Sequence, residues 1–97
     1  MKMKLLQFAI PEKLGEVAAE AATRVAGGAT LLEGVGFWVN GSGVVEREKV
    51  KWLVVGVEKE KVTEVVGIVL DILRSGGESA AFYISPENEP KLQWLKG

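Results

Sequence analysis

A turn-forming tetrapeptide between two apolar runs constrains this chain more than any other stretch of its sequence. Asn40-Gly41-Ser42-Gly43 consists of residues that favour tight turns, and apolar residues dominate on both sides of it. Such a turn between two apolar runs predicts a β-hairpin. We expect its first strand over Ala29–Val39. The second strand should begin between Val44 and Val50 and end at Val57.

Helical patterns lie on both sides of the hairpin. Apolar residues over Glu12–Ala26 recur at the i, i+3, i+4, i+7 spacing of one helix face, and Pro11 suits the first helical turn. Gly27-Gly28 then predicts the end of this helix. A second helix should include Glu58–Lys61 as a solvated connection and first turn, and should end near Ser75.

Shorter strands are expected at the two ends of the chain. We predict strands over Met3–Ile10 and Ala80–Ile84, a break over Ser85–Pro90, and a tail over Lys91–Gly97. The apolar side chains expected to anchor this tail are Leu92, Trp94 and Leu95. The order β-α-β-β-α-β predicts an α+β, ferredoxin-like plait, in which a four-stranded antiparallel sheet carries both helices on one face. Residues 1–97 should form this single domain.

The second hairpin strand is apolar on both of its sides. One side carries Val50, Trp52 and Val54, and the other carries Leu53, Val55 and Val57. A plait covers only one face of its sheet with helices, so the other apolar side would be left in water. Contiguous apolar area of this kind needs a cover, and a second copy of the same sheet is the simplest one. The sequence therefore predicts a homo-oligomer.

Composition excludes several classes of function. The chain has no Cys and no His, which removes thiol chemistry, the commonest metal ligand and the commonest general base. A net charge of −1 argues against a nucleic-acid partner, and no apolar run is long enough for membrane insertion. We expect no catalytic residues, no metal site and no enzymatic activity. The composition favours a cytoplasmic location and a thermophilic source.

Two segments resemble the PII signalling proteins. Gly28-Ala29-Thr30-Leu31-Leu32-Glu33-Gly34-Val35-Gly36-Phe37 resembles their second strand, which often has the pattern Gly-x-Thr-x-x-Glu-x-x-Gly-Phe. Arg74-Ser75-Gly76 lies where that family has Arg-Thr-Gly before its last strand. The segment from Asn88 to Leu95 is similar to the ending of the related CutA-type proteins. The resemblance implies a trimer of plaits whose sheets face inward.

The resemblance also implies a small anionic effector in clefts between subunits, with an adenine nucleotide as the candidate ligand. The ligand-binding residues it implies are Gly34, Gly36, Phe37, Arg74, Ser75, Gly76 and Gly77. The loop over Val39–Lys49 would contact a target protein through Asn40, Arg47 and Lys49. This loop is short for the family, and Gly77-Glu78-Ser79 replaces the usual Gly-Asp-Gly-Lys. The His and Cys ligands of metal-binding CutA-type proteins are absent.

Each candidate feature also has a structural interpretation. The Arg74–Gly77 segment is either an anion cradle or a helix C-cap with a tight turn. Gly34 and Gly36 predict a bulge, a bend, or close approach by a ligand or a neighbouring subunit. The charges of Arg47, Lys49 and Lys51 suit either an anionic ligand or a solvated hairpin. The three tryptophans are Trp38, Trp52 and Trp94. They suit either stacking on a ligand or packing in a core or subunit contact. The alternative function is therefore a ligand-free oligomerisation or adaptor domain.

Overall fold

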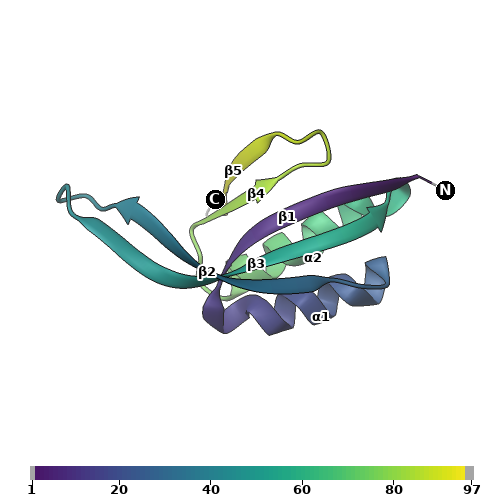
Figure 1. Cartoon of the computed structure of the whole chain (residues 1–97), viewed down its shortest axis with the longest axis horizontal. Coiled ribbons are helices and arrows are strands. Elements are labelled where there is room, and N and C mark those ends of the chain that lie inside the picture. The colour runs from purple at the N-terminus through teal and green to yellow at the C-terminus, as the bar shows by residue number, and fades with distance from the viewer. Residues whose placement is uncertain (1, 96–97) are drawn as a thin grey trace.

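The structure, a computed structural model, describes residues 2–95, which form two α-helices and one five-stranded antiparallel sheet (Figure 1). The strands are β1 (Met3–Pro11), β2 (Thr30–Val39), β3 (Val45–Glu58), β4 (Ala80–Ile84) and β5 (Pro90–Trp94). The helices are α1 (Gly15–Ala26) and α2 (Val62–Ser75), preceded by the 3₁₀ turns η1 (Glu12–Leu14) and η2 (Lys59–Lys61). The sheet order is β2-β3-β1-β4-β5, so β2 and β5 are the two edge strands.

The fifth strand corrects the expectation of a four-stranded sheet with an irregular tail. β5 pairs with β4 over five residue pairs, from Ala80 opposite Trp94 to Ile84 opposite Pro90. Pro90 was expected in a break, but it begins the strand, a position that tolerates proline because β5 is an edge. Of the three expected anchors only Leu95 is buried. The last two residues of the expected tail, 96 and 97, lie outside the described residues.

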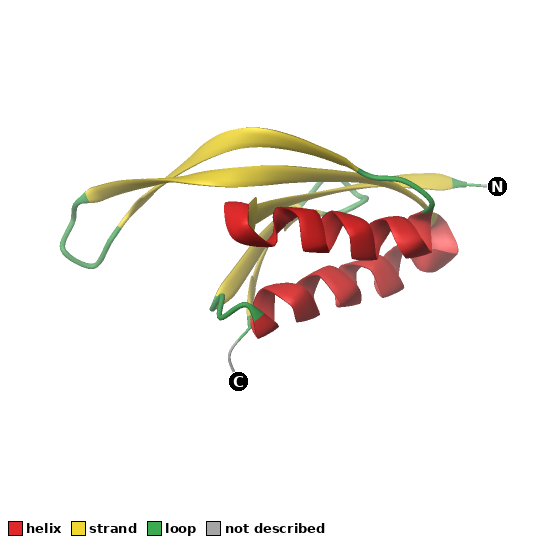
Figure 2. Cartoon of the chain, turned by 90° about the horizontal axis from the view of Figure 1, so that it is seen from below, coloured by secondary structure: helices red, strands yellow, loops and turns green. Residues whose placement is uncertain are grey.

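Both helices cover the same face of the sheet (Figure 2). The buried residues of β1 and β3 alternate along each strand, because successive side chains point to opposite faces. The core between sheet and helices includes Leu6, Phe8, Ile10, Leu53, Val55, Val57, Val65, Val69 and Leu73. The predicted helical periodicity is confirmed in α2, whose buried positions Val65, Val69 and Leu73 recur every four residues.

A glycine lies at each end of α1. Pro11 was expected in the first helical turn, yet it is the last residue of β1 and pairs with Val50. The α-helix begins at Gly15, where an added Cβ would lie 2.6 Å from Lys51 Cγ. Gly27 has a φ of 96° and its amide donates to the Thr23 carbonyl at 2.7 Å, which confirms the expected C-cap.

The β2–β3 hairpin is longer than the helices that cover the sheet, and its tip projects beyond them (Figures 1 and 2). The register runs without interruption from Thr30 opposite Val54 to Val39 opposite Val45. An unbroken register excludes a bulge at Gly34 or Gly36. The projection gives the molecule extents of 48 × 23 × 23 Å. Neither helix of the described residues has the length and apolar character needed to cross a membrane.

Candidate functional site

The Arg74–Gly77 segment ends helix α2. The backbone amides of Gly76, Gly77 and Glu78 donate to carbonyls of the last helical turns, at 2.9, 3.1 and 3.0 Å. Gly77 has a φ of 91°, which favours glycine. A Cβ on Gly76 would lie 2.5 Å from Leu14 Cδ1, so helix packing accounts for this glycine as well. These amides point back along the helix, and in this conformation they do not form an anion cradle.

The Arg74 guanidinium is engaged by two partners within the chain. Its Nε donates to the carbonyl of Leu95 at 3.1 Å, and its Nη1 lies 2.7 Å from Asp71 Oδ1. Two of its three nitrogens are therefore used, one of them against a carboxylate. The contacts of this segment support the helix-end interpretation, and anion binding by Arg74 stays a prediction.

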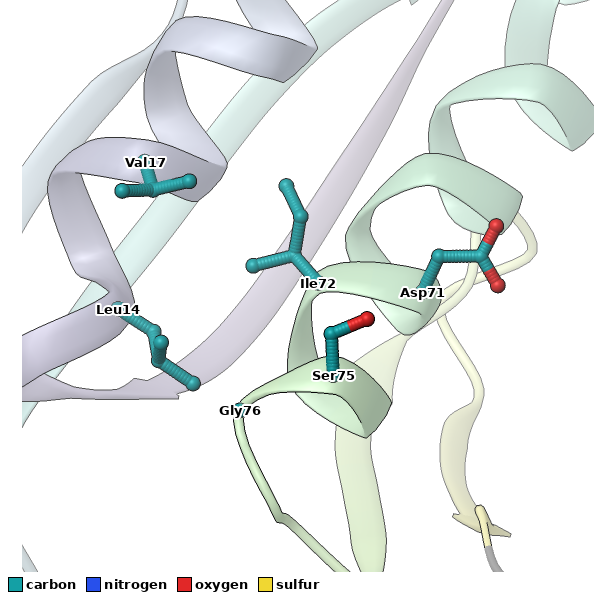
Figure 3. Close-up of a pocket in the computed structure, with 6 residues that line it drawn as sticks. All are labelled: Leu14, Val17, Asp71, Ile72, Ser75 and Gly76. Carbon is teal, nitrogen blue, oxygen red and sulfur yellow. The ribbon is translucent and has the colours of Figure 1, made fainter.

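Ser75 and Gly76 do border a pocket, which lies between the start of α1 and the end of α2 (Figure 3). Its volume is about 340 Å³. Leu14, Val17 and Ile72 line it with apolar side chains, and Asp71 contributes the charged one. A carboxylate at the rim repels an anion, so this pocket suits an apolar group better than a phosphate.

The expected β2 residues divide between the two faces of the sheet. Because side chains alternate along a strand, Gly34 and Gly36 lie on the helix-free face and Phe37 lies on the opposite one. Phe37 is exposed and packs under Arg47, whose guanidinium carbon lies 5.6 Å from the ring centroid. One ligand cannot contact Phe37 and the two glycines from the same side of the strand. Cation–π contact accounts for the position of Arg47.

Asn40 organises the hairpin tip. Its Oδ1 accepts hydrogen bonds from the amides of Ser42 and Val44 at 2.8 and 3.0 Å. Its Nδ2 donates to Glu46 Oε2 at 2.7 Å. With its side chain committed to the turn, Asn40 shapes the tip, and its contact with a target stays a prediction.

Cations and apolar groups share one side of the projecting hairpin. Arg47, Lys49 and Lys51 lie on the side of β3 that faces the helices further along the strand, and Val35, Arg47, Glu48 and Lys49 line a depression of about 370 Å³. Lys51 Nζ lies 3.4 Å from Glu33 Oε1. Lys51 is therefore paired at the body of the protein, and Arg47 and Lys49 form the cationic part of the projecting arm.

The helix-free face of the sheet carries seven exposed large apolar residues. Exposed residues on this face come from β1, β2, β4 and β5, and they are Met3, Leu5, Leu32, Trp38, Phe82, Leu92 and Trp94. Half-buried Val50, Trp52 and Val54 of β3 lie between them. All three tryptophans are on this face and none is in the core. The expected apolar second side of β3 is confirmed.

A polar pair lies within this apolar face. Trp52 Nε1 donates a hydrogen bond to Gln7 Oε1 at 2.9 Å, across the β1–β3 ladder. Gln7 lies opposite Val54 on one side and Ile84 on the other. The side-chain oxygen of Gln7 accepts this bond, and the side-chain amide of Gln7 is thereby held at the middle of the sheet.

Leu92 and Trp94 were expected as anchors of an irregular tail, and their place on this face was missed because β5 was not predicted. The alternation of polar and apolar residues over Lys91–Trp94 is the pattern of a half-buried strand and was a usable indication. Among residues 2–95 the structure has no group of three carboxylate, His or Cys side chains that could hold a metal ion.

Comparison with protein-family models and with curated proteins finds no match to this chain. Solved structures do resemble it. The periplasmic divalent cation tolerance protein CutA from Archaeoglobus fulgidus has a TM-score of 0.63 and 18% identity, over 73% of this chain and 72% of that chain. A Bacillus cereus protein related to NIF3 has a TM-score of 0.69 and 14% identity, over 98% of this chain. This chain spans only 26% of that protein.

A third similar structure is a phage SAM lyase in complex with S-methyl-5'-thioadenosine. Its TM-score is 0.58 at 11% identity, over 96% of this chain and 80% of that chain. At these identities the similarity shows the fold alone. The expected resemblance to CutA-type proteins is confirmed for the fold.

Proposed function

We propose that this protein is a self-associating module of the CutA-like fold, which assembles as a homo-oligomer through the helix-free face of its sheet. The observation that carries the proposal is the apolar face itself, which extends over all five strands. Water-exposed apolar area of this extent on a small domain is typical of an interaction surface.

The size of the face suits a stable interface. Trp38, Phe82 and Trp94 are 42%, 44% and 71% exposed. Since an aromatic side chain presents about 150–250 Å² when fully exposed, these three alone contribute on the order of 300 Å² of apolar surface. The remaining exposed residues of the face bring the total towards the roughly 800 Å² that each partner buries in a typical stable complex.

Three copies are the number that the PII-like resemblance implies. Analytical ultracentrifugation across a concentration series tests the assembly. A single species of three times the chain mass at micromolar concentration is expected. A monomer that keeps its fold under these conditions contradicts the proposal.

A second candidate function is effector-dependent signalling, and the projecting hairpin favours it. Next to its tip, one side of the hairpin combines exposed Phe37 of β2 with the cations Arg47 and Lys49 of β3, so it offers an anionic partner both charge and apolar area. In this proposal a small anion binds between subunits near Arg74, and the end of the hairpin, residues 39–49, contacts a target protein. The role is one of binding and not of catalysis, in a cytoplasmic setting.

Calorimetry against ATP, ADP, cyclic dinucleotides and S-methyl-5'-thioadenosine tests this second candidate. Saturable binding that is lost in Arg74→Ala supports the predicted site. Binding lost instead in Arg47→Ala places the anion on the hairpin. No heat with any compound, from a well-folded oligomer, leaves the assembly module as the function.

A further inference from the structure

The two ends of the helix-free face carry different side chains. β2 and β5 are the edge strands at opposite ends of the sheet. The β2 end carries Gly34 and Gly36, which have no side chains. The β5 end carries exposed Leu92 and Trp94 on the same face. The β2 end therefore has a gap without side chains between exposed Leu32 and Trp38, and the β5 end carries two large apolar side chains.

Neither a steric clash, nor a positive φ, nor a bulge requires the two glycines. A Cβ on Gly34 or Gly36 would lie 3.5 or 3.4 Å from a methyl group of Val50, an ordinary van der Waals distance. Neither residue has positive φ, and the register of the strand is continuous. Glycine inside a strand lowers its stability, because the unfolded chain is more flexible and no side chain packs. The absence of side chains at these two positions lets another chain approach the backbone of this strand closely.

The β5 end offers a suitable group. Trp94 is 71% exposed and lies opposite Ala80, whose side chain is small. Leu92, opposite Phe82, is exposed on the same face. A flat indole ring can lie directly on the two positions of β2 that have no Cβ atoms. Leu32 and Trp38, both exposed on β2, border the glycine strip on its two sides.

We propose that Trp94 of one subunit packs on the Gly34–Gly36 strip of a second copy of this chain. The contact joins two different patches, so it is heterologous, and a rotation that closes produces a ring. This inference rests on the proposed self-association and adds the residues that direct it. The contact requires the two glycines and Trp94 to be on the same face of the sheet, as they are.

Bulky substitutions on the glycine strip test this contact. Gly34→Val and Gly36→Val should raise the dissociation constant of the assembly at least tenfold. Valine is favoured in strands, so circular dichroism should be unchanged, and the melting temperature of the dissociated chain should be equal or higher. Trp94→Ala should give the same dissociation. Val35→Leu, which adds bulk on the other face of β2, is the matched control and should leave the assembly intact.

Cross-linking gives a direct test, because the chain has no native cysteine. Gly36→Cys and Trp94→Cys variants, mixed and oxidised, should form a covalent pair that neither variant forms alone at the same rate. Val17→Cys on α1 replaces Gly36→Cys in the control mixture. A wild-type oligomer that is unaffected by all these substitutions overturns the Trp94 contact while leaving self-association standing. A monomeric wild-type protein overturns both.

Discussion

Arg74 Nε donates a hydrogen bond to the carbonyl of Leu95 at 3.1 Å, and this contact joins the end of α2 to the residue after β5. The amide of Leu95 donates in turn to the Ser79 carbonyl at 2.8 Å, and its side chain is only 4% exposed. Arg74 thus holds the C-terminal strand against the body of the protein. Its position in the sequence suggested a ligand contact, but its observed partners are structural.

Arg74→Ala should lower the free energy of unfolding by about 1–2 kcal/mol, because the partly buried carbonyl of Leu95 loses its charged hydrogen-bond donor. Urea denaturation at fixed protein concentration measures the change. Hydrogen exchange should show faster amide exchange in residues 90–95 than elsewhere. Arg24→Ala, an exposed arginine in the last turn of α1, is the control and should change neither. Equal exchange of β5 in Arg74→Ala and wild type would contradict the tether.

Truncation to alanine should lower the stability of the chain at Leu95 and weaken self-association at Leu92. Leu95→Ala removes a core side chain and should lower the free energy of unfolding by about 2–4 kcal/mol. Leu92 is 62% exposed, so Leu92→Ala should change chain stability by less than about 0.5 kcal/mol and should instead weaken self-association. Thermal unfolding and sedimentation measure the two effects. Equal destabilisation by both substitutions would mean that β5 packs differently.

The sequence pattern predicts both helices, β1 and β3 because each of them buries one periodic face. Leu6, Phe8 and Ile10 alternate in β1, and all three are buried in the core. β2 has no buried residue, and its prediction came from the turn that follows it. β5 was not predicted because Pro90, which begins the strand, was assigned to a break over Ser85–Pro90, and because the strand pairs only with β4. Apolar Leu92 and Trp94 suggested burial in a tail. Both belong instead to the exposed face, which only the sheet register reveals.

The candidate site was less predictable than the fold. Gly76 and Gly77 fit both a phosphate loop and a helix end, and the sequence cannot separate the two. Tertiary contacts distinguish the two interpretations. Leu14 packs against Gly76, and the Leu95 carbonyl accepts a hydrogen bond from Arg74, which is 21 residues away in the sequence. Phe37 and Gly36 are adjacent in the chain and face opposite sides of β2. A motif matched along the sequence does not record this division.

Two helical glycines should respond with opposite signs to alanine. At Gly67, in α2, an added Cβ meets no atom within 4 Å, so Gly67→Ala should raise the free energy of unfolding by up to about 1 kcal/mol. At Gly15 the same atom would lie 2.6 Å from Lys51 Cγ, so Gly15→Ala should destabilise the protein. Thermal unfolding distinguishes them. Stabilisation by Gly15→Ala would show that Lys51 does not pack on the start of α1.

The Trp52–Gln7 hydrogen bond predicts a non-additive pair of substitutions. Gln7→Leu removes the acceptor and leaves Trp52 Nε1–H without a partner in a half-buried position, which should lower the free energy of unfolding by about 1–2 kcal/mol. Gln7→Leu combined with Trp52→Phe removes donor and acceptor together, and most of the loss should be recovered. A double-mutant cycle by urea denaturation measures the coupling. If the effects of Gln7→Leu and Trp52→Phe on the free energy of unfolding simply add, the hydrogen bond does not contribute to stability.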